Sequence, residues 1–138
     1  NPADSDYHKL MQVAEFFAKQ GQQARLTPKM SRPQKFVYQN IYHSLMGTKY
    51  EGKCPDLLID GKWYEHEGFT SSNPKRAFRN MLNDGLKQSD RLIIDKPDLT
   101  EAYMKRIIHQ RIKDGQRITE VWLKNGEKLE VLYKKLEE

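Results

Sequence analysis

The sequence predicts an α+β protein in which a single mixed β-sheet is flanked by helices. Three observations support this class. Several stretches repeat apolar residues at helical spacing, short runs of β-forming residues lie between them, and the pairs Asp60-Gly61 and Asn125-Gly126 each join two such runs. The expected order of elements is α-β-(α)-β-β-α-β-α-β-β, with one domain over residues 1–138.

The first half of the chain begins with a predicted helix over residues 4–20. Its apolar face follows the i, i+3, i+4, i+7 pattern through Leu10, Val13, Ala14 and Phe17. A short strand follows in QQARLT and stops before Pro28. Residues 34–46 are expected to form a second helix, which Gly47 ends.

The stretch CPDLLIDGKWYEHEGF, residues 54–69, predicts two short strands joined by a two-residue turn. A turn at Asp60-Gly61 sets the register, so that Leu57 faces Tyr64 and Asp56 faces Glu65. Since side chains alternate along a strand, Asp56, Glu65 and Glu67 are expected on one face and His66 on the other.

The second half repeats a helix-then-strand pattern. A helix is expected from Pro74 to about Ser89, because Pro suits the first helical turn. The strand RLIID, residues 91–95, is nearly all apolar, which is typical of a strand covered on both faces. A third long helix is capped by Asp98 or Thr100, and a hairpin on Asn125-Gly126 closes the chain.

The amino-acid composition excludes some classes of protein and favours others. The chain has 138 residues, of which 37% are hydrophobic and 31% charged, so it suits a folded rather than a disordered protein. No apolar run approaches the roughly 20 residues of a membrane span, so we expect no membrane partner. A single cysteine excludes an internal disulfide and a thiol-rich zinc site. The net charge of +5 suits a polyanionic partner such as nucleic acid.

The three acids of the hairpin are its most unusual feature. Like charges opposite each other weaken a sheet by up to about 1 kcal/mol, so Asp56 and Glu65 need a compensating role. With Glu67 they would hold a divalent cation such as Mg²⁺ or Mn²⁺, pair with Lys or Arg of the next helix, or divide acid and base roles. The structural alternative is a solvated strand end, and for His66 a surface or structural histidine.

Basic residues follow the hairpin and precede it. On the predicted helix, the candidate groups for binding a phosphate are Lys75, Arg76, Arg79, Lys87 and Gln88. Lys29 and Arg32 lie in an acid-free stretch over residues 19–35. Aromatics around the hairpin would stack on unpaired bases or belong to the core. An ordinary polar helix face is the alternative for the basic helix.

Several segments resemble a known group of nucleases. AEFFAKQGQQARLTPK, PDLLIDGKWYEHEG and GLKQSDRLIID, followed by a helix and a hairpin, resemble the toxin nuclease domains at the C-termini of contact-dependent growth inhibition proteins. Related domains occur in phage and mobile-element proteins. Many belong to the barnase/EndoU/colicin/RelE-like ribonucleases, and the PD…E-x-K arrangement is shared in outline with PD-(D/E)xK nucleases. The resemblance covers about residues 10–134.

This resemblance implies cleavage of RNA, such as tRNA, at a site built from Asp56, Glu65 and Lys87. It also implies a cytoplasmic site of action, delivery within a larger secreted protein and an immunity-type protein partner. Glu67 departs from the pattern, because lysine is usual there. Two mechanisms stay open. Without metal, Glu65 or His66 acts as acid or base. With Mg²⁺ or Mn²⁺, the ion is held by Asp56, Glu65 and Glu67.

Two other functions compete with a nuclease. One is a catalytically inactive nucleic-acid-binding module of a mobile element, which the replacement of lysine by Glu67 favours. The other is a protein-interaction module whose acidic hairpin docks a basic partner. Binding of nucleic acid without cleavage separates the first from a nuclease, and absence of all nucleic-acid binding at low salt indicates the second.

Overall fold

A computed structural model describes residues 5–27 and 35–136 of the chain. The predicted nucleic-acid-binding residues Lys29 and Arg32 lie outside the described residues. Within them, no helix is long and apolar enough to cross a membrane.

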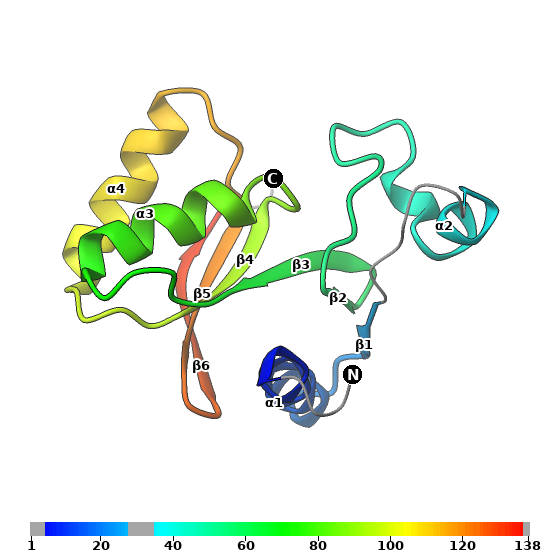
Figure 1. Ribbon diagram of the computed structural model, residues 1–138, viewed down its shortest axis with the longest axis horizontal. Coiled ribbons are helices and arrows are strands. Elements are labelled where there is room, and N and C mark those ends of the chain that lie inside the picture. The colour runs from blue at the N-terminus through cyan, green and yellow to red at the C-terminus, as the bar shows by residue number, and fades with distance from the viewer. Residues whose placement is uncertain (1–4, 28–34, 137–138) are drawn as a thin grey trace. The chain divides into compact units, whose positions relative to one another are not determined.

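The observed elements confirm the α+β class and the expected order (Figure 1). In chain order they are α1 (Ser5–Lys19), β1 (Ala24–Leu26), α2 (Lys35–Ile41), the short 3-10 helix η1 (His43–Leu45), β2 (Leu57–Ile59), β3 (Lys62–Glu67), α3 (Pro74–Gly85), β4 (Arg91–Asp95), α4 (Glu101–Lys113), β5 (Glu120–Asn125) and β6 (Lys128–Lys134). The predicted helix over residues 34–46 is therefore two shorter pieces, and α3 ends four residues before Ser89.

The six strands form a mixed sheet in the order β1-β2-β3-β4-β5-β6. Strands β1, β2 and β3 pair antiparallel, β3, β4 and β5 pair parallel, and β6 returns antiparallel to β5. Parallel neighbours need a long crossover connection, and α3 and α4 supply the two that this sheet requires. The strand RLIID is β4, and its central position agrees with its apolar sequence.

The chain divides into two compact units, residues 1–64 and residues 65–138. We call them the N-terminal unit and the C-terminal unit. The expectation that residues 1–138 form one domain stays a prediction.

The described core of the N-terminal unit is rich in aromatic rings. One of its clusters consists of Tyr42, Leu45, Tyr50 and Trp63, which are all at most 9% exposed. On α1, Val13 and Phe17 are buried as the helical pattern predicts, and the Phe17 ring lies 5.8 Å from the Tyr64 ring. Aromatic rings thus pack together with aliphatic side chains such as Leu57 and Ile59 in the described part of this unit.

The C-terminal unit has a larger core made mainly of aliphatic side chains. Helices α3 and α4 lie side by side over one face of its strands (Figure 1). The predicted stripe of α3 is buried there, with Ala77, Phe78, Met81 and Leu82 each at most 1% exposed. From the sheet, Leu92, Ile94, Val121 and Leu123 complete the cluster.

The first hairpin has the register that its turn predicts. Leu57 pairs with Tyr64 and Ile59 pairs with Lys62. Asp60 and Gly61 both have positive φ, 47° and 78°, which is the conformation of a tight two-residue hairpin turn. The prediction is confirmed as far as Leu57, where β2 begins. The pairing of Asp56 with Glu65 lies beyond this ladder and stays a prediction.

Candidate functional site

Glu65 and Glu67 lie on the face of β3 that carries the core of the C-terminal unit. Glu65 pairs with Leu92, and Glu67 pairs with Ile94, in the parallel ladder between β3 and β4. Paired residues project from the same face of a sheet, and Leu92 and Ile94 belong to the cluster under α3 and α4. Glu65 is only 5% exposed. Two carboxylates on one face of one strand are thus directed toward the helices.

Gly85 lets the Glu67 side chain approach the last turn of α3. A Cβ atom at position 85 would lie 3.1 Å from Glu67 Cγ and 2.8 Å from a methyl group of Leu92. Glycine inside a helix costs about 1 kcal/mol relative to alanine. The close approach of Glu67 and Leu92 explains why glycine stands at position 85 in spite of this cost. Helical propensity alone does not reveal that reason. The second acid of the strand is therefore held against the C-terminal end of α3.

Asp56 belongs to the N-terminal unit, whereas Glu65 and Glu67 belong to the C-terminal unit. It is 8% exposed, and its backbone carbonyl accepts a 3.0 Å hydrogen bond from the Thr27 N–H. Across residues 5–27 and 35–136, no group of three His, Cys, Asp or Glu side chains is placed to hold a metal ion. The Mg²⁺ or Mn²⁺ site formed by all three acids stays a prediction.

His66 projects from the other face of β3 and is paired with Asp95. Its Nε2 atom lies 2.8 Å from Asp95 Oδ1, and the two side chains are 5% and 12% exposed. Sequence reasoning missed Asp95, although its position gives a signal. It ends a strand parallel to β3, so its carboxylate lies near the residues that end β3. Such a buried pair orients the imidazole, which suits a structural or a positioning role for His66.

The opposite ends of the parallel strands carry a different set of charges. Arg91 Nε donates to Glu120 at 3.0 Å, and Arg117 Nε donates to Asp90 at 2.9 Å. Trp122 Nε1 also donates to Glu120. These pairs join the starts of β4 and β5 and have the character of a structural network. The carboxyl ends, where open sheets of this kind bind ligands, carry Glu67 and Asp95 instead.

Helix α3 begins with a well-formed cap and exposes its predicted basic side. Asn73 accepts a hydrogen bond from the Arg76 N–H, and Pro74 occupies the first turn. Lys75, Arg76 and Arg79 are all exposed, as expected from their positions opposite the buried stripe. Beyond the helix, the Lys87 side chain is 70% exposed and lies 3.8 Å from Asp84, which is a weak surface pair.

Helix α4 adds basic groups that sequence reasoning did not single out. The Lys75 ammonium and the Arg106 guanidinium each lie 5.3 Å from the centre of the Tyr103 ring. Arg111 donates a hydrogen bond to Asn83 of α3. Partial burial, and next the nearby charge of Arg79, lowers the pKa of Arg111. Two like charges are thus brought together where α3 and α4 meet.

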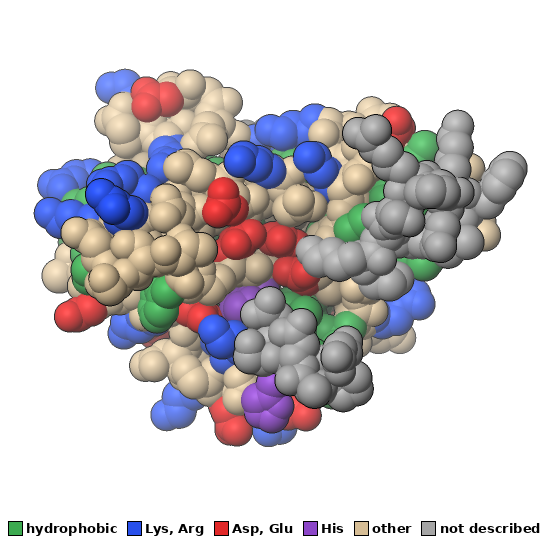
Figure 2. All heavy atoms as spheres, viewed as in Figure 1, with side chains coloured by type: hydrophobic (Ala, Val, Ile, Leu, Met, Phe, Trp, Pro, Cys, Tyr) green, Lys and Arg blue, Asp and Glu red, His purple; other side chains and the backbone are tan. Residues whose placement is uncertain are grey.

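Together, α3 and α4 account for the charge excess of the chain. They contain seven Lys and Arg against Asp84 and Glu101, a net of +5, which equals the formal charge of all 138 residues. Figure 2 shows Lys and Arg side chains gathered over these helices. We call this the α3–α4 basic surface, formed by Lys75, Arg76, Arg79, Lys105, Arg106, Arg111 and Lys113. A surface of this kind attracts phosphates.

The aromatic residues around the first hairpin divide between core and surface. Trp63, Tyr64 and Tyr50 are 8%, 3% and 9% exposed, so these three residues belong to the core, which was one of the two alternatives predicted for them. Phe69, which follows β3, is 54% exposed. The next residue, Thr70, accepts a hydrogen bond of 2.9 Å from Asn80 of α3, which anchors this loop to the helix.

Comparison with protein-family models, curated proteins and solved structures finds no match for this chain. The resemblance to toxin nucleases therefore remains a prediction from the sequence.

Proposed function

We propose that this protein is a nuclease of the toxin or mobile-element type that cleaves RNA. The observation that carries the proposal is the position of Glu65 and Glu67. Both project from one face of β3 into the region covered by α3. The exposed side of that helix is basic. The two acids thus lie on the side of α3 that faces the sheet, and the cations lie on its solvent side; phosphodiester cleavage needs both kinds of group.

Without a metal, Glu65 would accept the proton of the ribose 2′-hydroxyl as this oxygen attacks the phosphorus. His66, held by Asp95, would be the alternative acid or base. Cations of α3 and the nearby Lys87 would stabilise the extra negative charge of the five-coordinate phosphorus. The bond from phosphorus to the 5′-oxygen would break as this oxygen takes up a proton from the general acid or from water, and the other product would carry a 2′,3′-cyclic phosphate.

With a metal, the carboxylates of Asp56, Glu65 and Glu67 would hold Mg²⁺ or Mn²⁺ through oxygen ligands. The ion would supply an activated water. Glu67, which replaces the usual lysine, would then act as a third oxygen donor. In the metal-free mechanism, Lys75, Arg76 or Lys87 would instead supply the positive charge of the usual lysine.

The sequence resemblance to toxin nucleases favours RNA over DNA as the substrate. On the same ground we propose an immunity-type protein as a second partner and the cytoplasm as the site of action. The α3–α4 basic surface would contact the phosphate backbone. Phe69, exposed beside α3, would stack on an unpaired base, and such stacking contributes about 1–3 kcal/mol.

A second candidate is nucleic-acid binding without cleavage. The charge on α3 and α4 favours it, because this surface needs none of the three acids to attract a phosphate backbone. Glu67 in place of lysine also agrees with loss of catalysis.

Incubation with total RNA and with plasmid DNA, each with Mg²⁺ and with excess chelator, tests the proposal. The decisive variant is Glu65→Gln, which removes a charge and preserves size. Glu127→Gln at the exposed turn before β6 is the matched control. We expect cleavage of RNA by the wild type and the control, and a loss of about 10²–10⁴-fold in Glu65→Gln.

The products distinguish the mechanisms. Cleavage in chelator that leaves a cyclic phosphate supports the metal-free route and contradicts the metal route. Cleavage that is lost in chelator and restored only by Mg²⁺ or Mn²⁺ supports the metal route and contradicts the metal-free route. Salt-dependent binding with no cleavage by the wild type contradicts the nuclease proposal and supports the binding module.

A further inference from the structure

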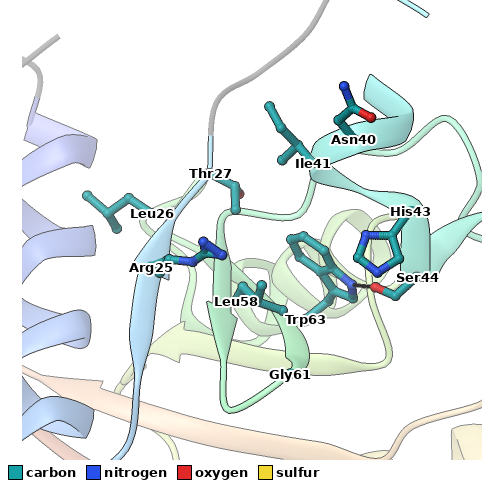
Figure 3. Close-up of a pocket in the computed structure, with 10 residues that line it drawn as sticks. All are labelled: Arg25, Leu26, Thr27, Asn40, Ile41, His43, Ser44, Leu58, Gly61 and Trp63. Carbon is teal, nitrogen blue, oxygen red and sulfur yellow. Dashed lines mark hydrogen bonds between the residues drawn. The ribbon is translucent and has the colours of Figure 1, made fainter. Parts of the chain in front are cut away.

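We infer that a pocket in the N-terminal unit binds one unpaired nucleotide of single-stranded RNA. This inference rests on the proposed function in taking RNA as the ligand. The pocket has a volume of about 550 Å³, within the usual range of small-ligand sites. It lies among β1, the α2–η1 segment and the β2–β3 hairpin, and its residues all belong to residues 1–64 (Figure 3).

The apolar part of the pocket is rigidly supported. Trp63 and Leu58 both line it. The indole Nε1 of Trp63 donates a 2.6 Å hydrogen bond to Ser44 Oγ, which fixes the ring. Behind Trp63, the Tyr42 ring lies 4.9 Å away, and the Tyr38 ring stacks on Tyr42 at 4.8 Å. A ring held in this way forms part of a preformed wall against which a planar base can pack.

The polar part of the pocket has three side chains with hydrogen-bonding groups. Arg25, Asn40 and His43 line it from β1, α2 and η1, and Figure 3 shows Trp63 between Arg25 and His43. Within the described part of the chain, these three side chains make no hydrogen bond and no ion pair. The described residues that line the pocket include no acid. The site therefore presents positive charge and hydrogen-bond donors to an anionic ligand.

A nucleotide matches each of these groups. The guanidinium of Arg25 binds a phosphate in a planar, bidentate manner. The amide of Asn40 donates and accepts, as the edge of a base requires, and the His43 ring can stack or hydrogen-bond. A purely apolar ligand would use none of these three groups, and a base inside a duplex does not expose a face to a pocket of this kind.

The test measures binding of a short 2′-O-methyl RNA oligonucleotide in chelator, so that no cleavage through the 2′-hydroxyl interferes. Inorganic polyphosphate, which has the charge of a backbone and no bases, is the second probe. The variants are Arg25→Ala, His43→Ala and Ser44→Ala, all at exposed positions, and Lys19→Ala on α1 is the control with the same loss of charge as Arg25→Ala.

We expect Arg25→Ala to weaken RNA binding about tenfold, since a hydrogen bond to a charged group is lost. Ser44→Ala and His43→Ala should weaken RNA binding by about three- to tenfold and leave polyphosphate binding unchanged, because they act on the base. Lys19→Ala should have less effect than Arg25→Ala on RNA.

The pocket proposal would be overturned if Arg25→Ala and Lys19→Ala weakened RNA binding equally. It would also be overturned if all three pocket variants lost affinity for RNA and for polyphosphate to the same extent. An acidic peptide that competes for the site more strongly than the oligonucleotide would overturn it as well. A separate cleavage assay tells the two proposals apart. If the pocket variants lose RNA binding while the wild type cleaves nothing, the pocket proposal is supported and the nuclease proposal is refuted. If the wild type cleaves RNA while the pocket variants bind RNA as the wild type does, only the pocket proposal is refuted.

Discussion

The two units of this protein are built in different ways. Strands β1 and β2 of the N-terminal unit have three residues each, and one of its clusters is three aromatic rings and one leucine. Strands β4, β5 and β6 of the C-terminal unit have five to seven residues, with a core that is mostly aliphatic. The first unit contains the pocket, and the second contains Glu65, Glu67 and the basic helices.

This difference suggests a division of work. Longer strands and a larger core hold side chains within the small tolerances that catalysis needs. A smaller unit with a polar-rimmed pocket is better suited to recognise a ligand than to position reacting groups.

The largest effect is expected from truncation of the C-terminal core. Ile94→Ala should lower the free energy of unfolding by about 2–5 kcal/mol, because Ile94 is fully buried between the sheet and the helices. Leu45→Ala in the smaller N-terminal cluster should cost less, since its surroundings can collapse into the space. Denaturant unfolding followed by circular dichroism measures both. An equal or larger loss for Leu45→Ala would contradict the contrast between the cores.

A smaller loss is expected from Gly85→Ala. Helical propensity favours alanine by about 1 kcal/mol, but the new methyl group would meet Leu92 and Glu67. We expect a net loss of about 1–3 kcal/mol from overpacking. Asp84→Ala, at the neighbouring exposed position, is the control and should change stability little. A more stable Gly85→Ala protein would show that Glu67 does not lie against α3.

The α3–α4 basic surface should contribute to affinity and hardly to stability. Arg79→Ala combined with Arg111→Ala relieves a like-charge repulsion and should weaken RNA binding about tenfold. The slope of log affinity against log salt should become shallower by about 0.7 for each single-strand phosphate that the protein no longer neutralises. Lys128→Ala with Lys134→Ala, on β6, controls for net charge. An unchanged salt dependence in the Arg79→Ala, Arg111→Ala variant would show that RNA does not bind at the α3–α4 basic surface.

The smallest effect concerns alkaline pH and the aromatic core of the N-terminal unit. Burial raises the pKa of Tyr42 above its ordinary value near 10. The unfolded chain therefore loses this proton first, so stability present below about pH 10 is lost as the pH rises further. Tyr42→Phe should reduce that fall, and Tyr133→Phe in the C-terminal unit is the control. Identical alkaline unfolding of wild type and Tyr42→Phe would argue against this burial.

Local patterns predicted most of the fold. The apolar stripe of α3 and the register set by Asp60-Gly61 are properties of neighbouring residues, and both are confirmed. The end of α3 was less predictable. Its turn-like continuation after Gly85 depends on backbone bonds such as the 2.9 Å hydrogen bond from the Gln88 N–H to the Gly85 carbonyl. Helical periodicity does not reveal where such a transition occurs.

The site was harder to predict because its groups meet through tertiary contacts. The sequence marks Glu65 and Glu67, but it does not place Asp95 beside His66 or Arg111 beside Asn83. It also predicted Trp63 as either a core or a stacking residue. In the structure Trp63 is 8% exposed and packs on Tyr42, as the core alternative predicts, whereas stacking on a base stays a proposal.

Single-turnover cleavage of one RNA by Glu65→Gln and by Arg25→Ala tests the central claim most directly. If chemistry belongs to the C-terminal unit and recognition of an unpaired nucleotide to the N-terminal unit, Glu65→Gln should lower the rate at saturating protein and leave the half-saturating concentration unchanged. Arg25→Ala should raise the half-saturating concentration and leave the maximal rate unchanged. A full maximal rate for Glu65→Gln, or a lowered maximal rate with unchanged binding for Arg25→Ala, would contradict the division of work between the two units.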